Sequence, residues 1–406
     1  MRMSLIDLGL RHWAGKLSAL LITVNVLSCS GVKRRVPRDG VNDVRSYPGA
    51  PSSVNSELEV ISGDPRVAWR ATAGRGTVGA AAIGDRVIGI ATIDRWVYAL
   101  DSRTGQTYWR HRGEAPFGTG PLMSGGRIYA ATEGRMGALI ALDLYTGKRR
   151  WRTLVGDVAA PLVLRDSVVY GATHMEGRAF AVNARTGKLL WSRPIGPSLS
   201  GPLLTNDGRV VVATLTDTLF VINAVTGSIT NRLPLARSTT ATIALANDST
   251  VVLASPSGHV TAITLGARNG DSGGTGEART SSSGRTLSAP SSAWSVATSA
   301  PVLGAPIVWG DTVFALTTAC DFWTIPVASP TTARQVKLRC NSVAAPTLVR
   351  DGVLVATVRG ELAMFDRQTG VRLWERQIGS ELRHPAVVRN GQIVLAPILG
   401  NIVSLR

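Results

Sequence analysis

The chain has 406 residues, of which 44 are Lys or Arg and 27 are Asp or Glu, giving a formal net charge of +17. Glycine is abundant at 43 residues, only 17% of residues are charged, and apolar residues fall in short runs rich in Val, Ile, Leu and Ala. This composition favours short strands joined by tight turns over long amphipathic helices. The basic excess suits anionic partners, but the folded part has no RNP-like aromatic pattern, helix-turn-helix spacing or Lys/Arg block, so we expect no nucleic-acid partner.

The first 28 residues have the pattern of a secretory signal. Arg2, Arg11 and Lys16 precede the apolar run LSALLITVNVLS. At about 12 residues this run is shorter than the ~20 that a membrane-spanning helix needs. We therefore predict a signal peptide over residues 1–28.

Cys29 follows Val26-Leu27-Ser28, which resembles a bacterial lipobox. In such signals the cysteine becomes the acylated first residue of the mature chain, and two or more acyl chains give stable anchoring. We predict lipidation of Cys29, with a plain signal peptide and a chance cysteine as the alternative. Ser30 resembles the sorting signal for the outer membrane, so we expect a lipid-anchored protein there that faces the periplasm, with the inner membrane left open.

Residues 29–64 are polar and rich in Pro, Gly and Ser, which is typical of a flexible tether. Lys33, Arg34 and Arg35 lie close to the predicted lipid and could touch anionic headgroups.

Beyond residue 64 the sequence repeats. Two-residue turn signals that precede an apolar run recur at steps of 41, 41, 41, 41, 62, 41 and 39 residues, at Gly84-Asp85, Gly125-Gly126, Asp166-Ser167, Asp207-Gly208, Asp248-Ser249, Gly310-Asp311, Asp351-Gly352 and Asn390-Gly391. A fixed period of this size indicates a repeat array.

Each unit contains four short apolar stretches separated by turn residues, which is the pattern of a propeller blade with four antiparallel strands. The eight units predict an all-β, eight-bladed β-propeller over residues 65–406, or seven blades if one degraded copy misleads. The last unit ends after three strands at residues 401–406, so we expect the N-terminal strand RVAWRAT, with Trp69, to complete the eighth blade and close the ring.

A shared turn sequence, Asp/Asn-x-x-Thr-Gly-x-x-x-Trp, links the third and fourth strands of the best-preserved units. We expect the Asp or Asn to accept backbone hydrogen bonds, the Gly to supply a positive φ, and the Trp to pack between blades. The residues are Asp101, Gly105 and Trp109; Asp143, Gly147 and Trp151; Asn183, Gly187 and Trp191; and Asp366, Gly370 and Trp374.

The middle copies depart from this pattern. Asn231 stands where the fourth copy would have Trp, and in the fifth copy residues 266–293 intervene before Trp294. This low-complexity segment predicts a disordered loop insertion, whose role the sequence does not indicate.

Cys320 and Cys340 could form a disulfide in an oxidising compartment. The predicted strands place both at one end of the sixth sheet, at the close of its second and fourth strands. Those strands are not neighbours, so a bridge would need loop movement, and the pairing stays open.

The A-x-D-x-x-T-G-x-x-x-W repeats resemble the PQQ-type eight-bladed propellers. One branch comprises quinoprotein dehydrogenases, which hold pyrroloquinoline quinone (PQQ) and calcium beside a disulfide between adjacent cysteines. This chain has no adjacent cysteines and is shorter than most such enzymes. The other branch comprises BamB-like lipoproteins of the outer-membrane β-barrel assembly machinery. The lipobox, tether and length match that branch, which implies a membrane-anchored protein-binding scaffold that holds the barrel-forming subunit and has no enzymatic activity.

In BamB-like propellers the contacts come from loops that lead into the middle blades. The corresponding loops here are GPSLSGP (196–202) and LARSTTAT (235–242), which makes Leu199 and Arg237 the candidate contact residues. No Arg follows Leu199 and the loops carry no Asp pair, so the partner and the binding face stay open.

The sequence provides no catalytic, cofactor or metal motif, because the histidines of the folded part lie in separate units. We expect a monomeric scaffold that is not an enzyme. A PQQ-dependent or small-ligand-binding propeller and a generic cell-envelope lipoprotein are the alternatives.

Overall fold

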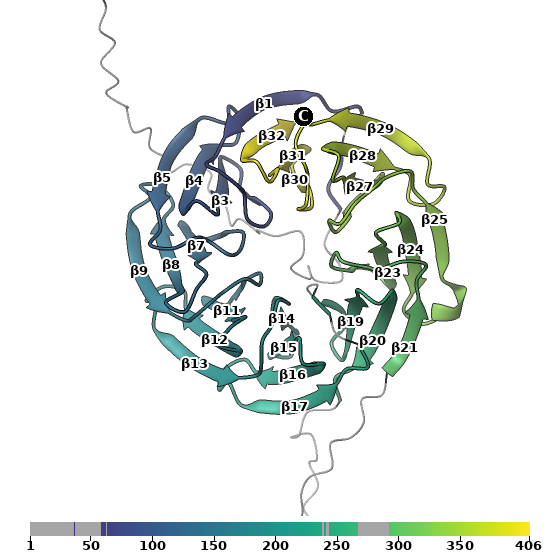
Figure 1. Cartoon of the computed structure of the whole chain (residues 1–406), viewed down its shortest axis with the longest axis horizontal. Helices are drawn as coiled ribbons and strands as arrows, with labels where there is room; N and C mark the ends of the chain where they lie inside the picture. Colours follow the sequence, from purple (N-terminus) through teal and green to yellow (C-terminus); the bar gives the residue numbers. More distant parts are fainter. Residues whose placement is uncertain (1–35, 37–57, 62, 238, 241–242, 267–291) are drawn as a thin grey trace, which may run out of the picture. The chain divides into compact units, whose positions relative to one another are not determined.

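The computed structural model describes residues 36, 58–61, 63–237, 239–240, 243–266 and 292–406 (Figure 1). Within them, regular structure is all β except for the 3₁₀ turn η1 (Pro330–Thr332). None of their helices has the length and apolar character of a membrane span. The signal peptide over 1–28, Cys29 and nearly all of the insertion over 266–293 lie outside the described residues.

Eight sheets of four antiparallel strands follow one another along the chain. Blades 1 to 4 contain β2 (Ala82–Ile83), β3 (Val87–Ala91), β4 (Trp96–Asp101) and β5 (Thr107–Arg112); β6 (Leu122–Ser124), β7 (Arg127–Ala131), β8 (Ala138–Asp143) and β9 (Arg149–Leu154); β10 (Val163–Arg165), β11 (Val168–Ala172), β12 (Arg178–Asn183) and β13 (Leu189–Pro194); and β14 (Leu203–Leu204), β15 (Arg209–Ala213), β16 (Thr218–Asn223) and β17 (Ile229–Pro234).

The second half of the ring has the same design. Blades 5 to 8 contain β18 (Ala244–Asn247), β19 (Thr250–Ser255), β20 (His259–Thr264) and β21 (Ser292–Ala297); β22 (Ile307–Trp309), β23 (Thr312–Leu316), β24 (Asp321–Pro326) and β25 (Arg334–Lys337); β26 (Thr347–Val349), β27 (Gly352–Ala356), β28 (Glu361–Phe365) and β29 (Arg372–Gln377); and β30 (Val387–Arg389), β31 (Gln392–Leu395), β32 (Asn401–Leu405) and β1 (Val67–Thr72).

Figure 1, viewed along the ring axis, shows the sheets around a common centre, with the fourth strand of each blade outermost. The predicted eight-bladed propeller is therefore confirmed. Its closure is confirmed as well, because β1 pairs with β32 and Trp69 lies opposite Ser404. Arg66 and Arg406 extend this pairing by exchanging backbone hydrogen bonds of 2.8 and 3.0 Å.

The antiparallel order gives the ring two faces. The turn face holds the turns after the first and third strands of each blade. The linker face holds the segments between blades and the turns after the second strands. Isolated bridges join these two kinds of segment on the linker face, Thr77 with Thr92 and Phe117 with Thr132. The linker face therefore offers irregular backbone and side chains on a rigid base, as binding loops commonly do.

The repeated Asx turns are held by their own side chains. Asp101 Oδ1 accepts hydrogen bonds from the backbone N–H groups of Arg103 and Thr104 at 2.8 and 3.1 Å. The same arrangement recurs at Asp143, Asn183, Asn223 and Asp366. Burial raises the pKa of Asp101, but these bonds and one from Tyr108 outweigh it and hold that pKa below its ordinary value.

The turn glycines have a second role that the sequence pattern did not reveal. Gly147 has a φ of 69°, and a Cβ there would lie 2.6 Å from the Trp109 ring of the preceding blade. Gly227 likewise leaves space for Trp191, at 2.5 Å. The glycine is required both for the left-handed backbone and for the indole that packs against it.

The tryptophans also join neighbouring blades by hydrogen bonds. The indole N–H of Trp191 donates to the carbonyl of Ala224 at 2.9 Å, just after the third strand of the next blade. Equivalent bonds run from Trp69 to Ser102, Trp109 to Leu144 and Trp151 to Ala184. In blade 4, Asn231 replaces the tryptophan and its amide still donates to Leu265, at 2.9 Å.

The described residues of the segment predicted as a tether over 29–64 pack against the propeller. Ile61 is 4% exposed within the core shared by blades 7 and 8, and the N–H of Arg350 donates to the carbonyl of Glu59 at 2.9 Å. Val36 is 2% exposed among residues of blades 1 and 2. The composition concealed these contacts because a few aliphatic side chains are enough to dock a polar segment.

Cys320 and Cys340 form a disulfide, with a Cα–Cα distance of 5.7 Å. The predicted strand positions were wrong, because Cys320 does not close the second strand. It lies in the turn that begins β24, where its carbonyl accepts a hydrogen bond from Leu338, just after β25. Since β24 and β25 are neighbours, the bridge needs no loop movement.

Candidate partner-binding site

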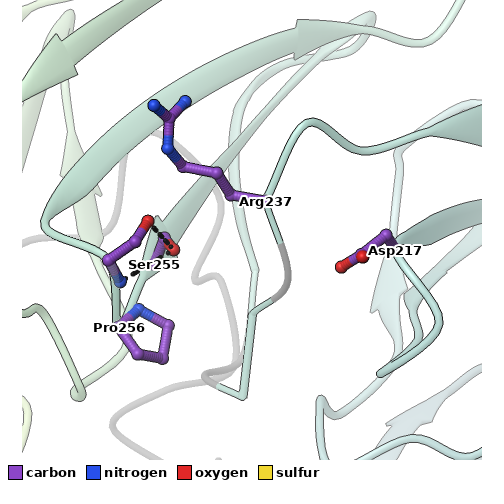
Figure 2. A pocket seen from close by; sticks show the side chains of 5 residues that line it. Asp217, Arg237, Ser255 and Pro256 are labelled. Carbon is purple, nitrogen blue, oxygen red and sulfur yellow. Dashed lines mark hydrogen bonds between the residues drawn. The ribbon is translucent and has the colours of Figure 1, made fainter.

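A hollow of about 490 Å³ opens on the linker face between blades 4 and 5 (Figure 2). It is lined by Asp217, Arg237, Ser255, Pro256 and Ser257. Three chain segments supply these residues: the turn between β15 and β16, the segment between β17 and β18, and the end of β19 with the turn that follows it. The hollow thus gathers one carboxylate, one guanidinium, two hydroxyls and a proline on two blades.

The backbone around the hollow is fixed by local hydrogen bonds. Asp217 has a φ of 55°, and its carbonyl accepts from the N–H of Leu235 at 2.7 Å. The Ser255 and Ser257 hydroxyls lie 2.8 Å apart, and the N–H of Ser257 donates to Ser255 Oγ at 3.1 Å. These contacts hold the rim in place while Arg237 stays exposed.

Figure 2 shows Arg237 and Asp217 on opposite sides of the space, with the guanidinium directed away from the carboxylate. The two opposite charges therefore do not neutralise each other. A partner that crossed the hollow could meet a hydrogen-bond donor set on one side and an acceptor on the other.

Two further hollows flank this one along blade 4. A slot of about 180 Å³ continues from Arg237 between the aliphatic side chains of Leu235, Leu253 and Ile263. On the other side of the blade, a hollow of about 520 Å³ is lined by a mostly apolar set, Pro194, Ile195, Gly196, Thr218, Phe220, Arg232 and Pro234. Together they form a band of alternating apolar and charged surface on blades 3 to 5, which is the composition of protein-binding patches.

Arg232 fits this band as a second exposed cation. Its guanidinium carbon lies 5.8 Å from the centre of the Phe220 ring, a cation–π contact that leaves the N–H edges accessible. Arginines stacked on aromatic rings are common anchors of protein interfaces because one side chain offers both apolar contact and five donors.

Only one of the two predicted contact residues lines a hollow. Arg237 lines two of the three hollows, whereas Leu199 lines none of them. Leu199 is half-buried in the segment from blade 3 to blade 4, between two buried serines. Ser198 Oγ donates to the carbonyl of Ala213 at 2.7 Å, which fixes this segment.

Asp217, Phe220 and Arg232 were missed by the sequence analysis. Asp217 lies in a hairpin turn, and the other two lie on strands that fit the repeat pattern. Only the three-dimensional arrangement brings the turn of one blade beside the linker of the next. The presence of Asn231 in place of Trp was the one available signal that blade 4 differs from its neighbours.

A metal site would use a group of donor side chains. The described residues contain no group of three or more His, Cys, Asp or Glu side chains arranged to hold a metal ion. The two described cysteines bridge positions 20 residues apart, so they cannot form the adjacent-cysteine disulfide of the quinoprotein pocket.

The fold defines an eight-bladed propeller of the PQQ repeat class. The family model described as outer membrane protein assembly factor BamB matches residues 56–198 and 175–397. The chain belongs to this family.

Individual relatives come from both branches of the superfamily. BamB from Burkholderia pseudomallei is 25% identical over 265 residues, which is 64% of this chain and 55% of that protein. Polyvinylalcohol dehydrogenase from a Sphingopyxis species is 33% identical over 147 residues, 28% of this chain and 21% of that enzyme. The chain thus spans about half or less of the length of these curated relatives. The crystal structure of BamB from Moraxella catarrhalis superposes with a TM-score of 0.65 at 14% identity, covering 84% of this chain and 99% of that chain, which supports the fold.

Proposed function

We propose that this protein is a BamB-like scaffold of the cell envelope, anchored to the outer membrane by a lipid on Cys29 and facing the periplasm. Its partner is a subunit of the machinery that assembles outer-membrane proteins. The observation that carries the proposal is the open, charged hollow at Asp217 and Arg237 on a propeller of the BamB family. In this role the protein works by binding and has no enzymatic activity.

The size of the site supports a protein partner. Three hollows lie on blades 3 to 5, and two of them share Arg237, which suits an extended segment or a small domain better than a single small molecule. Exposed arginines at positions 232 and 237 would give such an interface its anchors.

Site-specific photocrosslinking in cells tests the proposal. A photoreactive amino acid at position 237 is expected to capture the barrel-forming subunit of the assembly machinery. The matched control places it at Arg334, an exposed arginine on the outer strand of blade 6. Capture at neither position, or equal capture at both, would contradict a partner site on blades 4 and 5.

A quinoprotein activity is the second candidate, favoured by the similarity to polyvinylalcohol dehydrogenase. The purified protein would then bind PQQ with calcium, show the quinone absorption band and support dye-linked alcohol oxidation. We expect none of these, because the described residues offer neither the metal donors nor the adjacent cysteines that such a site uses.

A further inference from the structure

The outer wall of blades 1 and 2 is strongly basic. Its strands β5 and β9 present Arg110 and Arg112, and Arg149, Arg150 and Arg152, with no Asp or Glu on either strand. By contrast β21, the outer strand of blade 5, carries no charged residue. The outer strands of blades 1 and 2 thus carry five arginines between them.

Nearby acids neutralise only part of this wall. Arg149 and Arg152 both reach Glu114, at 2.7 and 3.1 Å, and Arg150 pairs with Asp143. Arg110 and Arg112 instead lie over Trp96, with guanidinium carbons 4.6 and 5.9 Å from the ring centre. Stacking of this kind holds the guanidinium plane and leaves its N–H edges free to bind an oxyanion such as phosphate.

Exposed apolar side chains border these arginines. Ile93, Met136 and Leu154 are 55%, 70% and 50% exposed. All three lie at the linker-face end of the wall, where Arg112 pairs with Trp96 and Arg152 donates to the carbonyl of Met136 at 3.5 Å. Exposed aliphatic groups beside cations and a half-buried tryptophan are the composition of surfaces that lie in a membrane interface.

The N-terminal segment reaches the same blades. Val36 is buried in a cluster with Phe117, Met123 and Leu144 of blades 1 and 2. Val36 is seven positions after Cys29, so the chain between them spans at most about 25 Å. An acyl anchor on Cys29 would therefore hold blades 1 and 2 close to the lipid surface.

We propose that the corner formed by Ile93, Trp96, Arg110, Arg112 and Met136, here named the basic corner, binds the phosphate headgroups of an anionic membrane surface. This inference rests on the envelope location given under the proposed function. It adds how the propeller is oriented on the membrane. With blades 1 and 2 on the membrane, the hollow between blades 4 and 5 lies on another part of the ring and stays accessible to a protein partner. A lipid surface is favoured over a polyanionic chain because the apolar groups and the anchor lie at the same corner.

The test is binding of the exported full chain, in a Cys29→Ser background, to vesicles of phosphatidylglycerol in phosphatidylcholine. Removing the acyl site makes the protein surface, rather than the lipid, decide binding. We expect Arg110→Gln/Arg112→Gln to weaken partitioning about thirtyfold, which corresponds to roughly 1 kcal/mol per arginine near the surface. Ile93→Ser/Met136→Ser should weaken it by a smaller factor, and salt should weaken the binding of the parent chain.

Arg334→Gln/Arg339→Gln is the matched control, because it removes two exposed charges from blade 6. We expect its partitioning to stay within about threefold of the parent chain. An equal loss in both pairs would overturn the proposal in favour of net charge alone. Equal binding to vesicles of pure phosphatidylcholine, or binding to DNA or an acidic protein in place of vesicles, would overturn it as well.

The readouts separate this inference from the proposed function. Crosslinking through position 237 is expected to persist in Arg110→Gln/Arg112→Gln, since the two sites lie on different blades. Vesicle binding without any crosslinked partner would remove the assembly role and leave the basic corner standing. Crosslinking without vesicle binding would remove only the basic corner.

Discussion

The blades of this propeller are joined in two different ways. The fourth strands of blade 8 and of blades 1 to 4 each donate a side-chain hydrogen bond to the next blade, from a tryptophan or from Asn231. Around blades 6 and 7 the pattern fails. Val336 contacts Gly370 where the tryptophan would be, and the indole N–H of Trp374 is buried with no acceptor among the described residues.

The order of the strands along the chain explains why the indole of Trp374 has no acceptor within the described part of the chain. The acceptor is in each case the carbonyl that follows the third strand of the next blade, and for the four tryptophans it lies inside the Asx turn. Blade 8 has no such turn, because its fourth strand β1 comes from the other end of the described chain. Trp323 and Arg367 of blades 6 and 7 also bury polar atoms without a partner. The unpaired indole of Trp374 thus follows from the missing turn in blade 8, and the disulfide lies nearby in blade 6.

The largest effect should come from the tryptophans. Trp191→Ala removes a ring that is 4% exposed and its hydrogen bond to Ala224, so we expect a loss of about 3–5 kcal/mol in the free energy of unfolding. Trp374→Ala should cost clearly less, because that ring is half-buried and its N–H is unpaired. Denaturant unfolding measures both, and an equal loss would contradict the distinction between the two regions.

Reduction of the disulfide should have the next largest effect. Cys320 and Cys340 close a loop of 20 residues, for which chain entropy predicts about 3 kcal/mol. Thermal unfolding of Cys320→Ser/Cys340→Ser, compared with the parent chain with and without reductant, measures the change. If the oxidised parent and the variant unfold at the same temperature, the bridge does not compensate for the missing side-chain bonds.

The turn glycines allow a sharper comparison. Gly147→Ala should cost about 2–4 kcal/mol, because the new Cβ would strain the left-handed backbone and lie 2.6 Å from Trp109. Gly125→Ala is the control, since its φ is 54° and no atom lies within 4 Å of the added Cβ. We expect about 1 kcal/mol there, from the backbone alone. If both variants lose a similar free energy of unfolding in chemical denaturation, packing against the tryptophan is not the reason that glycine is needed.

The smallest effect on stability is expected from lowering the pH. Burial raises the pKa of Asp321, but hydrogen bonds from Ser299 and Lys337 outweigh it and lower that pKa below its ordinary value. A carboxyl with a lowered pKa in the folded state stabilises the protein above its unfolded pKa of about 4, and this contribution is lost as the pH falls further. Asp321→Asn should therefore lose less stability than the parent chain between pH 5 and about pH 2 in thermal unfolding curves. An unchanged pH dependence would show that this carboxyl makes no contribution.

The sequence by itself determined the architecture. Eight units in phase, the Asx turns and the unpaired strand around Trp69 each followed from local chemistry, because turns and strand patterns are encoded in neighbouring residues. Arg237 is a candidate contact only through the resemblance of its loop to those of BamB-like propellers, and that role stays a prediction.

Only the tertiary structure decided how these parts meet. The acceptor of each tryptophan lies more than 30 residues away, the hollow at Asp217 needs two blades side by side, and the pairing of Cys320 depends on which strand it begins. The packing of Val36 and Ile61 likewise joins segments that no local pattern connects. These features depend on distances through space, and a sequence fixes such distances only once the ring has closed.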